Sequence, residues 1–134
     1  MGDAGVTVPP GFTRLFPYVF ADEPDELLAF LTQGLSGTVT SEGRAPDGSL
    51  GNAHVVFGDT TIMVSQARGE WTATRGTFYL YVAEADAAME RATAAGGTVR
   101  MPAADMPYGD RQGGIEDPAG NVWWLSQRLA DGEY

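Results

Sequence analysis

The stretch GGIEDPAGNVWWLSQ, residues 113–127, decides how this chain folds. It reads as a short strand, a tight turn and a last strand that carries two adjacent tryptophans. Successive side chains of a strand point to opposite faces of the sheet. Trp123 and Trp124 must therefore face different surroundings, and the rest of the sequence has to show which of the two belongs to the core.

The elements around this stretch occur in the same order twice. The first half predicts a strand at 13–22, a helix at 22–35 and strands at 37–45, 52–59 and 60–66. The second half predicts a strand at 76–86, a helix at 85–97, a strand at 98–103, a loop at 104–112 and strands at 113–117 and 122–127. GTVT at 37–40 matches GTVR at 97–100, and VSQ at 64–66 matches LSQ at 125–127. The same order at the same spacing indicates a duplicated β-α-β-β-β unit.

Both predicted helices have helix-start or helix-stop signals and one apolar stripe. Pro24 and acidic neighbours fill the first turn of the first helix, as helix starts prefer. Gly34 ends the first helix, and Gly96 or Gly97 ends the second. The stripes consist of Leu27, Leu28, Phe30 and Leu31 in the first helix and Ala85, Ala88, Met89 and Ala92 in the second.

These elements divide the chain into segments. We expect a flexible N-terminus at 1–12, a first module at 13–67, a linker at 68–76, a second module at 77–128 and a C-terminal tail at 129–134. The two modules together form one domain, which a chain of 134 residues can support with a single core.

The alternation within four of the predicted strands separates a uniformly apolar face from a mixed one. An apolar face belongs under helices, where no polar group is satisfied, whereas a mixed face suits a ligand cleft. We therefore predict that Trp123 is core and Trp124 faces a cleft, the alternative for Trp124 being a partly exposed or interface position. The apolar set is Phe16, Tyr18, Phe20, Ile62, Val64, Phe78, Leu80, Val82, Trp123 and Leu125. The mixed set is Leu15, Pro17, Val19, Thr61, Met63, Ser65, Thr77, Tyr79, Tyr81, Val122, Trp124 and Ser126.

Composition excludes several classes of function. The chain is 43% hydrophobic and 19% charged, which is typical of a globular protein. Its net charge of −10 disfavours a nucleic-acid partner, because binding phosphates requires a basic surface. It has no cysteine, so disulfides and thiolate chemistry are excluded. The start lacks the pattern of a signal peptide and no apolar run is long enough to span a membrane, so we expect a cytoplasmic protein with no membrane partner.

Three segments carry a resemblance to a known family. They are YLYVAEADAAMERATAAGGTV at 79–99, YGDRQGGIEDPAGN at 108–121 and the closing VWWLSQ at 122–127. On these segments the chain resembles the vicinal oxygen chelate superfamily of glyoxalase I, extradiol dioxygenases and bleomycin-resistance proteins. The resemblance covers residues 14–128. It implies an α+β fold of tandem βαβββ modules that form a curled mixed sheet around a cleft, with the helices on the convex face.

The resemblance also locates the positions at which the family's metalloenzymes bind a divalent metal. Their ligands are His, Gln or Glu on inward strand positions, which fall here near Leu15, Met63, Thr77 and Trp124. None of these side chains binds such a metal well. We therefore predict no metal and no cofactor, and glyoxalase I and dioxygenase activities are disfavoured.

Other residues could serve catalysis or ligand binding in the cleft. His54, the single histidine, shares the parity of the mixed face, and Glu116 lies within the predicted strand at 113–117. Both are candidates for a general base, with a purely structural role as the alternative. Aromatic stacking with a few polar groups is how planar small molecules are held. The predicted ligand-binding residues are Met63, Trp71, Tyr79, Tyr81, Tyr108 and Trp124, with Arg111 and His54 as polar groups.

Two functions from different classes follow from these residues. The first is a metal-free protein that binds a small, planar, partly apolar molecule, like the antibiotic-sequestering proteins of the family. The second is a glyoxalase-type lyase or isomerase with an unusual metal site or none. A structural or regulatory domain without ligand is a third alternative. We further expect a homodimer, because open sheet edges require pairing and two-fold dimers are the commonest oligomers.

Overall fold

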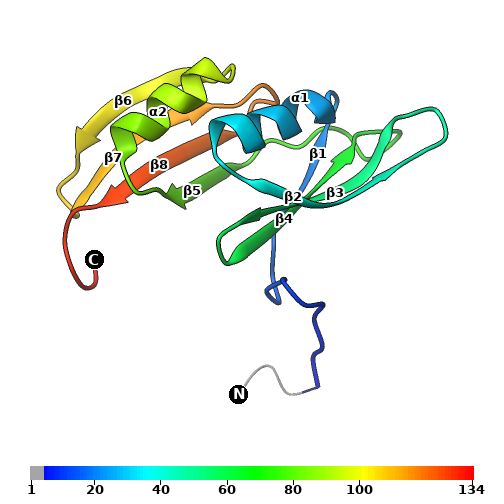
Figure 1. The fold of residues 1–134 in the computed structure, drawn as a ribbon, viewed down its shortest axis with the longest axis horizontal. Coiled ribbons are helices and arrows are strands. Elements are labelled where there is room, and N and C mark those ends of the chain that lie inside the picture. Colours follow the sequence, from blue (N-terminus) through cyan, green and yellow to red (C-terminus); the bar gives the residue numbers. More distant parts are fainter. Residues whose placement is uncertain (1–4) are drawn as a thin grey trace.

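The computed structural model of the chain describes residues 5–134, so the first part of the expected flexible N-terminus lies outside the described residues. The duplicated order of elements is confirmed (Figure 1). The first module consists of β1 (Tyr18–Ala21), α1 (Pro24–Ala29), the π-helical turn η1 (Phe30–Gly34), β2 (Thr38–Arg44), β3 (Leu50–Phe57) and β4 (Thr60–Gln66). The second consists of β5 (Thr77–Tyr81), α2 (Ala85–Ala94), β6 (Thr98–Asp105), β7 (Asp110–Glu116) and β8 (Val122–Arg128).

Each module builds its own four-stranded mixed sheet. The strand orders are β1-β4-β3-β2 and β5-β8-β7-β6, and β1/β4 and β5/β8 are the parallel pairs. The expected α+β fold of two βαβββ units is therefore confirmed. The expected single curled sheet is instead two curled sheets, because no strand pairing within residues 5–134 joins one module to the other.

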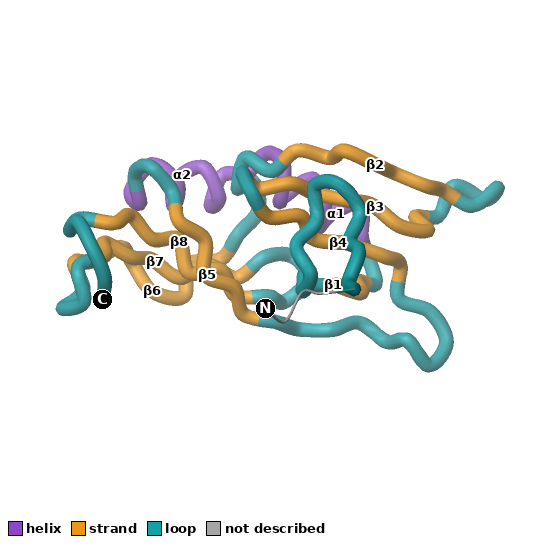
Figure 2. The backbone as a smooth tube through the Cα atoms, turned by 90° about the horizontal axis from the view of Figure 1, so that it is seen from below, coloured by secondary structure: helices purple, strands orange, loops and turns teal. Residues whose placement is uncertain are grey.

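The helices form one layer over both sheets. α2 packs against η1, so the helical segments of the two modules touch each other. α1 contacts β1 and β4, and α2 contacts β6, β7 and β8; in Figure 2 α2 lies along one side of the strands of the second module, and α1 overlaps the strands of the first. Each sheet therefore has a convex face under helices and a concave face that points away from them.

The core lies between helices and sheets, as the apolar stripes predict. All eight residues of the two predicted stripes are buried. All of them except Ala85 pack in one core cluster with Val55, Val64, Ile115 and Leu125 from the convex faces of the sheets. Burying apolar side chains on this scale is the main favourable term in folding.

The last strand answers the opening question. Trp123 is buried in this core, where its ring packs on Phe78 and Phe57 at centroid distances of 4.6 and 5.7 Å. The DPAGN turn holds it there, because the buried Asp117 carboxylate accepts hydrogen bonds from the Trp123 indole, the Asn121 amide side chain and the backbone N–H groups of residues 119 and 121. Trp124 lies on the other face and is half-buried, so the placement of the two tryptophans on opposite faces is confirmed, whereas a cleft in front of Trp124 stays a prediction.

The assignment of faces in the first strand is wrong. β1 begins at Tyr18, and its buried residues are Val19 and Ala21, whereas Tyr18 and Phe20 lie on the concave face. The reason is the parallel register, which places Tyr18 opposite Met63 and Phe20 opposite the next residue of that face. Residues 13–17 precede the strand: Leu15 is 88% exposed, and Phe16 and Pro17 have no strand parity at all.

The connection between β6 and β7 is shorter than the predicted loop at 104–112. Ala104 pairs with Gln112 and Asp105 with Arg111, which leaves only residues 106–109 outside the strands. The polar sequence is typical of a loop, but residues at both of its ends pair in an antiparallel ladder between β6 and β7. Tyr108 therefore lies in a tight turn and Arg111 in a strand.

Candidate functional site

The concave face of the first module carries a ladder of stacked rings. Tyr18 stacks on Phe20 at 4.6 Å with an interplanar angle of 29°, and Phe20 stacks on Trp71 at 6.4 Å with 18°. Met63 and His54 lie on the same face, because His54 pairs with Met63 and Met63 with Tyr18. We call these five residues the aromatic face.

The linker holds the outer end of this ladder in place. Thr74 exchanges backbone and side-chain hydrogen bonds with Phe20, at 2.9 and 3.0 Å, so residues 68–76 run beside β1. Arg68 and Trp71 pair with each other across a tight turn, at 2.9 and 3.0 Å. The Trp71 side chain remains 62% exposed. A large aromatic ring is thus fixed against the ladder and still open to solvent.

The segment before β1 covers the other end of the aromatic face. The Phe12 ring meets the His54 ring edge-on at 5.0 Å and the Phe16 ring at 4.7 Å. The Thr61 hydroxyl donates a hydrogen bond to the Gly11 carbonyl at 2.5 Å. His54 is therefore half-buried and packs edge-on against an aromatic ring.

The concave face of the second module is polar instead. Its centre is Asp110, which is fully buried. Its carboxylate accepts hydrogen bonds from the hydroxyls of Tyr79 at 2.5 Å and Tyr81 at 3.0 Å and from the Arg128 guanidinium at 2.9 Å. Gln112 Oε1 accepts from Tyr79 at 3.1 Å. With Ser126, which pairs with Gln112 across β7 and β8, the residues Tyr79, Tyr81, Asp110 and Gln112 form what we call the polar face.

Electrostatics keep this cluster in one protonation state. Burial alone would raise the pKa of Asp110, but the hydrogen bonds from Tyr79 and Arg128 and the Arg128 charge together lower it. Burial, followed by the hydrogen bond to Asp110, raises the pKa of Tyr79 far above its ordinary range. At neutral pH the face therefore holds a carboxylate and a protonated phenol, and its free edges offer hydrogen-bond acceptors.

Trp124 lies on β8, where it pairs with Tyr79 of the polar face on one side and with Gly114 of β7 on the other. Its indole donates to the Thr77 hydroxyl at 3.0 Å. Its ring covers Gly114 so closely that a Cβ built there would come within 2.6 Å of the ring. Tyr108, in the turn before β7, donates its hydroxyl to Gln112 at 2.5 Å. Glycine at 114 thus lets Trp124 lie flat on the sheet.

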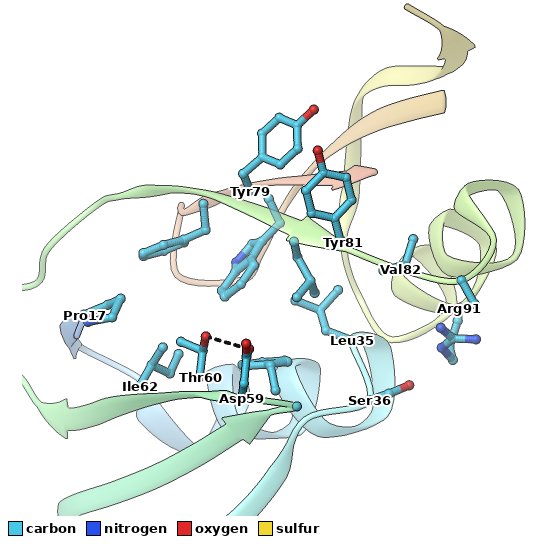
Figure 3. Close-up of a pocket in the computed structure, with 16 residues that line it drawn as sticks. Pro17, Leu35, Ser36, Asp59, Thr60, Ile62, Tyr79, Tyr81, Val82 and Arg91 are labelled. Carbon is cyan, nitrogen blue, oxygen red and sulfur yellow. Dashed lines mark hydrogen bonds between the residues drawn. The ribbon is translucent and has the colours of Figure 1, made fainter. Parts of the chain in front are cut away.

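A cavity of about 630 Å³ separates the two modules. Apolar side chains, among them Phe57, Ile62 and Trp123, line its floor. Figure 3 shows Arg91 and Ser36 near its mouth, and Tyr79 and Tyr81 pointing side by side away from the rest of the lining. These two tyrosines therefore belong both to the lining of the cavity and to the polar face.

Two of the predicted site residues lie outside both concave clusters. Arg111 points toward α2, where it forms ion pairs with Asp86 at 3.1 Å and Asp105 at 2.9 Å. Hydrogen bonds to these two carboxylates raise the pKa of Arg111. Glu116 forms an ion pair with Arg100. Both charges are neutralised locally, so neither serves as a polar group for a ligand in the arrangement described.

The residues at the family's metal positions do not fit a divalent metal. Leu15 lies outside the sheet, and the residues that pair with Met63 and Trp124 on the neighbouring parallel strands are Tyr18 and Tyr79. Divalent metals prefer imidazole and carboxylate donors, and this set supplies none. Within residues 5–134 no three His, Asp or Glu side chains gather at one point.

Sequence reasoning missed half of the concave side chains. Asp110 and Gln112 escaped because the segment DRQ was assigned to a loop, whereas it begins β7; Arg128 escaped because the last predicted strand ended at residue 127. Tyr18 and Phe20 were assigned to the core. Met63, Trp71, Tyr79, Tyr81, Tyr108 and Trp124 were named, and the structure divides them between the two faces: Met63 and Trp71 on the first module, the other four on the second.

Two βαβββ units with helices outside and open concave faces define a class of protein. The chain matches the family model of the Glyoxalase/Bleomycin resistance protein/Dioxygenase superfamily over residues 12–125, and it belongs to this superfamily. An uncharacterised protein of Mycobacterium tuberculosis is 28% identical over 128 residues, which cover 87% of this chain and 75% of that protein. No helix in the described part of the chain is long and apolar enough to span a membrane.

Solved structures show the same fold. The crystal structure of TioX from Micromonospora sp. ML1 is similar with a TM-score of 0.75 at 23% identity, over 87% of this chain and 99% of that one. Lactoylglutathione lyase from Agrobacterium tumefaciens is similar with a TM-score of 0.67 at 20% identity, over 95% of this chain and 100% of that one. At these identities the likeness concerns the fold.

Proposed function

We propose that this protein binds a planar, partly apolar small molecule on its concave faces without a metal. The observation that carries the proposal is the exposed ladder of Tyr18, Phe20 and Trp71. Core packing does not account for it, because the ladder lies on the face away from the helices and Trp71 is open to solvent. Stacking on aromatic rings is the usual way to hold a flat ligand.

The polar surroundings of the ladder restrict the ligand further. The protein carries a net charge of −10, which repels multiply charged anions at long range. Arg128, which lies beside the polar face, forms an ion pair with Asp110. A neutral or cationic ligand therefore fits these faces better than a nucleotide or a glutathione adduct.

The proposal includes a homodimer in which a second copy brings its polar face opposite the aromatic face. Within one chain the two faces belong to separate sheets. β5 pairs only with β8 in the described chain, which leaves its other edge next to the cavity between the modules. Open strand edges in native proteins are generally paired or covered. Light scattering at micromolar concentration tests this part, and a monomer would refute it.

Calorimetric titration tests the binding proposal directly. The ligands are a polyaromatic antibiotic, a nucleotide and the glutathione adduct of methylglyoxal. We expect heat of binding for the aromatic compound and at least a tenfold weaker response to the other two. Trp71→Leu should weaken aromatic binding about tenfold, which corresponds to the energy of one stacked ring.

A matched control separates stacking from a general loss of exposed apolar surface. Val99→Ala changes an exposed apolar side chain that lines a shallow pocket beside α2, away from both concave faces. It should leave aromatic binding unchanged. Selective binding or turnover of the glutathione adduct, without a response to the aromatic compound, would favour the glyoxalase-type lyase or isomerase instead.

A further inference from the structure

The polar face contains a buried hydroxyl that lacks a hydrogen-bond partner. Ser126 is fully buried, and its Oγ is the one buried side-chain polar atom in the described residues that makes no hydrogen bond. It lies close enough to the Tyr79 hydroxyl to lower the pKa of that phenol, but the Tyr79 O–H itself donates to Asp110. Buried polar groups are nearly always paired, so an orphan calls for a partner.

The first module shows how the same position is satisfied. Ser65 occupies the equivalent place, because Phe20 pairs with Ser65 as Tyr81 pairs with Ser126. The Ser65 hydroxyl bonds to the Tyr18 hydroxyl at 3.0 Å and accepts a hydrogen bond from the Asn52 side chain at 3.1 Å. In the second module the Tyr79 hydroxyl donates its hydrogen bond to Asp110, and the Ser126 hydroxyl is left without a hydrogen-bond partner.

The segment after β8 folds back over this face. Leu129 donates its backbone N–H to the Gly109 carbonyl at 2.8 Å, and Arg128 donates to the carbonyls of residues 132 and 133 at 3.3 and 3.1 Å. Tyr134 thereby comes under the Arg128 guanidinium, at 4.8 Å from its ring centroid. Figure 1 shows the segment turning back after β8.

Tyr134 meets the face as a ligand would. Its ring packs edge-on against Tyr108 at 6.3 Å, and its hydroxyl points at the Asp110 carboxylate from 3.5 Å. This hydrogen bond is long, and the side chain remains 76% exposed. The Tyr134 side chain therefore contacts the polar face, but only through weak interactions.

We propose that the polar face is a subsite for a phenolic ring, and that Tyr134 occupies it in the free chain as an internal competitor. The inference rests on the proposed function, since it concerns the same concave surface. The acceptors Asp110 and Gln112 receive a phenolic O–H, Arg128 lies over the ring, and the unpaired Ser126 hydroxyl lies next to these acceptors. An ionised phenolate is disfavoured because the Asp110 carboxylate repels it.

A competitor inside the chain reduces the apparent affinity for an external phenol to the intrinsic affinity multiplied by the fraction of time in which the subsite is empty. Removing the Tyr134 ring should therefore strengthen binding by about three- to tenfold, the range expected for one exposed cation–π contact with a long hydrogen bond. The hydroxyl alone contributes part of this, so Tyr134→Phe should give a smaller gain than Tyr134→Ala.

The experiment uses 2-naphthol, with 2-methoxynaphthalene as a matched probe that lacks the hydroxyl donor. Calorimetric titrations are run on the unchanged chain, on Tyr134→Ala, on Tyr134→Phe and on a variant that lacks residues 130–134. We expect 2-naphthol to bind at least fivefold more tightly than 2-methoxynaphthalene, and to gain three- to tenfold in the Tyr134→Ala and deletion variants. The acetylated, amidated hexapeptide LADGEY, residues 129–134, should bind the deletion variant in trans, and its LADGEF analogue should bind more weakly.

Several outcomes would overturn the inference. They are equal affinity for the two naphthalene probes, unchanged affinity in Tyr134→Ala, and no binding of 2-naphthol even by the deletion variant. The polyaromatic titration with Trp71→Leu separates this failure from failure of the proposed function. If aromatic binding still depends on Trp71 while the naphthol results fail, the proposed function stands and only the phenolic subsite is refuted.

Discussion

The contrast between Trp123 and Trp124 tests the assignment of faces most sharply. The two residues are neighbours of one type on one strand, so strand propensity and composition are matched. Trp123 is 4% exposed, and its indole hydrogen bond to Asp117 measures 2.9 Å. Replacing a buried tryptophan by alanine costs about 3–5 kcal/mol in the free energy of unfolding, from lost burial and the remaining cavity.

The same change at Trp124 should cost much less. Its ring is half-buried, and its hydrogen bond to Thr77 is exposed. We expect a loss of about 1 kcal/mol, from partial burial and one exposed hydrogen bond. For a domain of this size 1 kcal/mol lowers Tm by about 3–5 °C, so Trp123→Ala should lower Tm by roughly 10–20 °C and Trp124→Ala by about 5 °C or less.

Urea unfolding followed by circular dichroism measures both variants, and an unchanged m-value shows that the unfolded states remain comparable. Trp123→Phe serves as a control, because it keeps the packing on Phe78 and loses only the indole hydrogen bond and part of the ring. It should fall between the two alanine variants. Equal losses at positions 123 and 124 would refute the assignment of a covered face and an open face.

Three further outcomes follow from the geometry. Gly114→Ala should displace the Trp124 ring, which shifts tryptophan emission and costs about 1–2 kcal/mol by overpacking; unchanged emission would contradict the close approach. Asp117→Ala should cost about 3 kcal/mol or more in urea unfolding, because four donors lose their acceptor, and a loss below 1 kcal/mol would show that the turn holds without it. The lowered pKa of Asp110 means that its ionised form stabilises the fold above the ordinary pKa near 4, and this contribution disappears as pH falls through the lower folded value. Unfolding between pH 5 and about 2 should therefore depend less on pH in Asp110→Asn, and an unchanged profile would exclude this carboxyl as a source of the acid sensitivity.

The last strand was predictable because two independent signals agreed. The DPAGN segment marks a turn by its residue types alone, and it fixes which residue begins β8. Alternation then separates Trp123 and Leu125 from Trp124 and Ser126. The structure adds only the reason for Asp117, which anchors the turn and the core tryptophan together.

The first strand could not be assigned in the same way. β1 has four residues, and aromatic or small apolar side chains occupy both of its faces, so alternation offers no contrast. What decides its orientation is the parallel pairing with β4, a long-range contact that local sequence does not encode. The Tyr18 hydroxyl agrees with that orientation, because Ser65 satisfies it on the concave face and the helix side offers no partner.

The polar face was hidden for a related reason. Its members come from β5, β7 and β8, and they converge on Asp110 only when the sheet is assembled. In the sequence Asp110 and Arg111 look alike, two charges in one polar segment. Strand parity sends Asp110 to the concave face and Arg111 to the carboxylates beside α2. Which face a charged residue of this segment occupies is therefore decided by the pairing of β7 with β6 and β8.

The duplication explains why the two concave faces do different work. Tyr18, Ser65 and Asn52 in the first module have their equivalents in Tyr79, Ser126 and Gln112 in the second, so both modules carry the same tyrosine, serine and amide. The decisive difference lies two residues before the amide, where the first module has the buried Leu50 and the second has Asp110. The leucine leaves tyrosine and serine bonded to each other and the first face closed to hydrogen bonding, so its rings offer stacking area. The Asp110 carboxylate accepts the hydrogen bonds of the Tyr79 and Tyr81 hydroxyls, and the Ser126 hydroxyl remains unpaired. The second face therefore offers directional hydrogen bonds. A ligand that uses both faces would be oriented by the second module and held by the first.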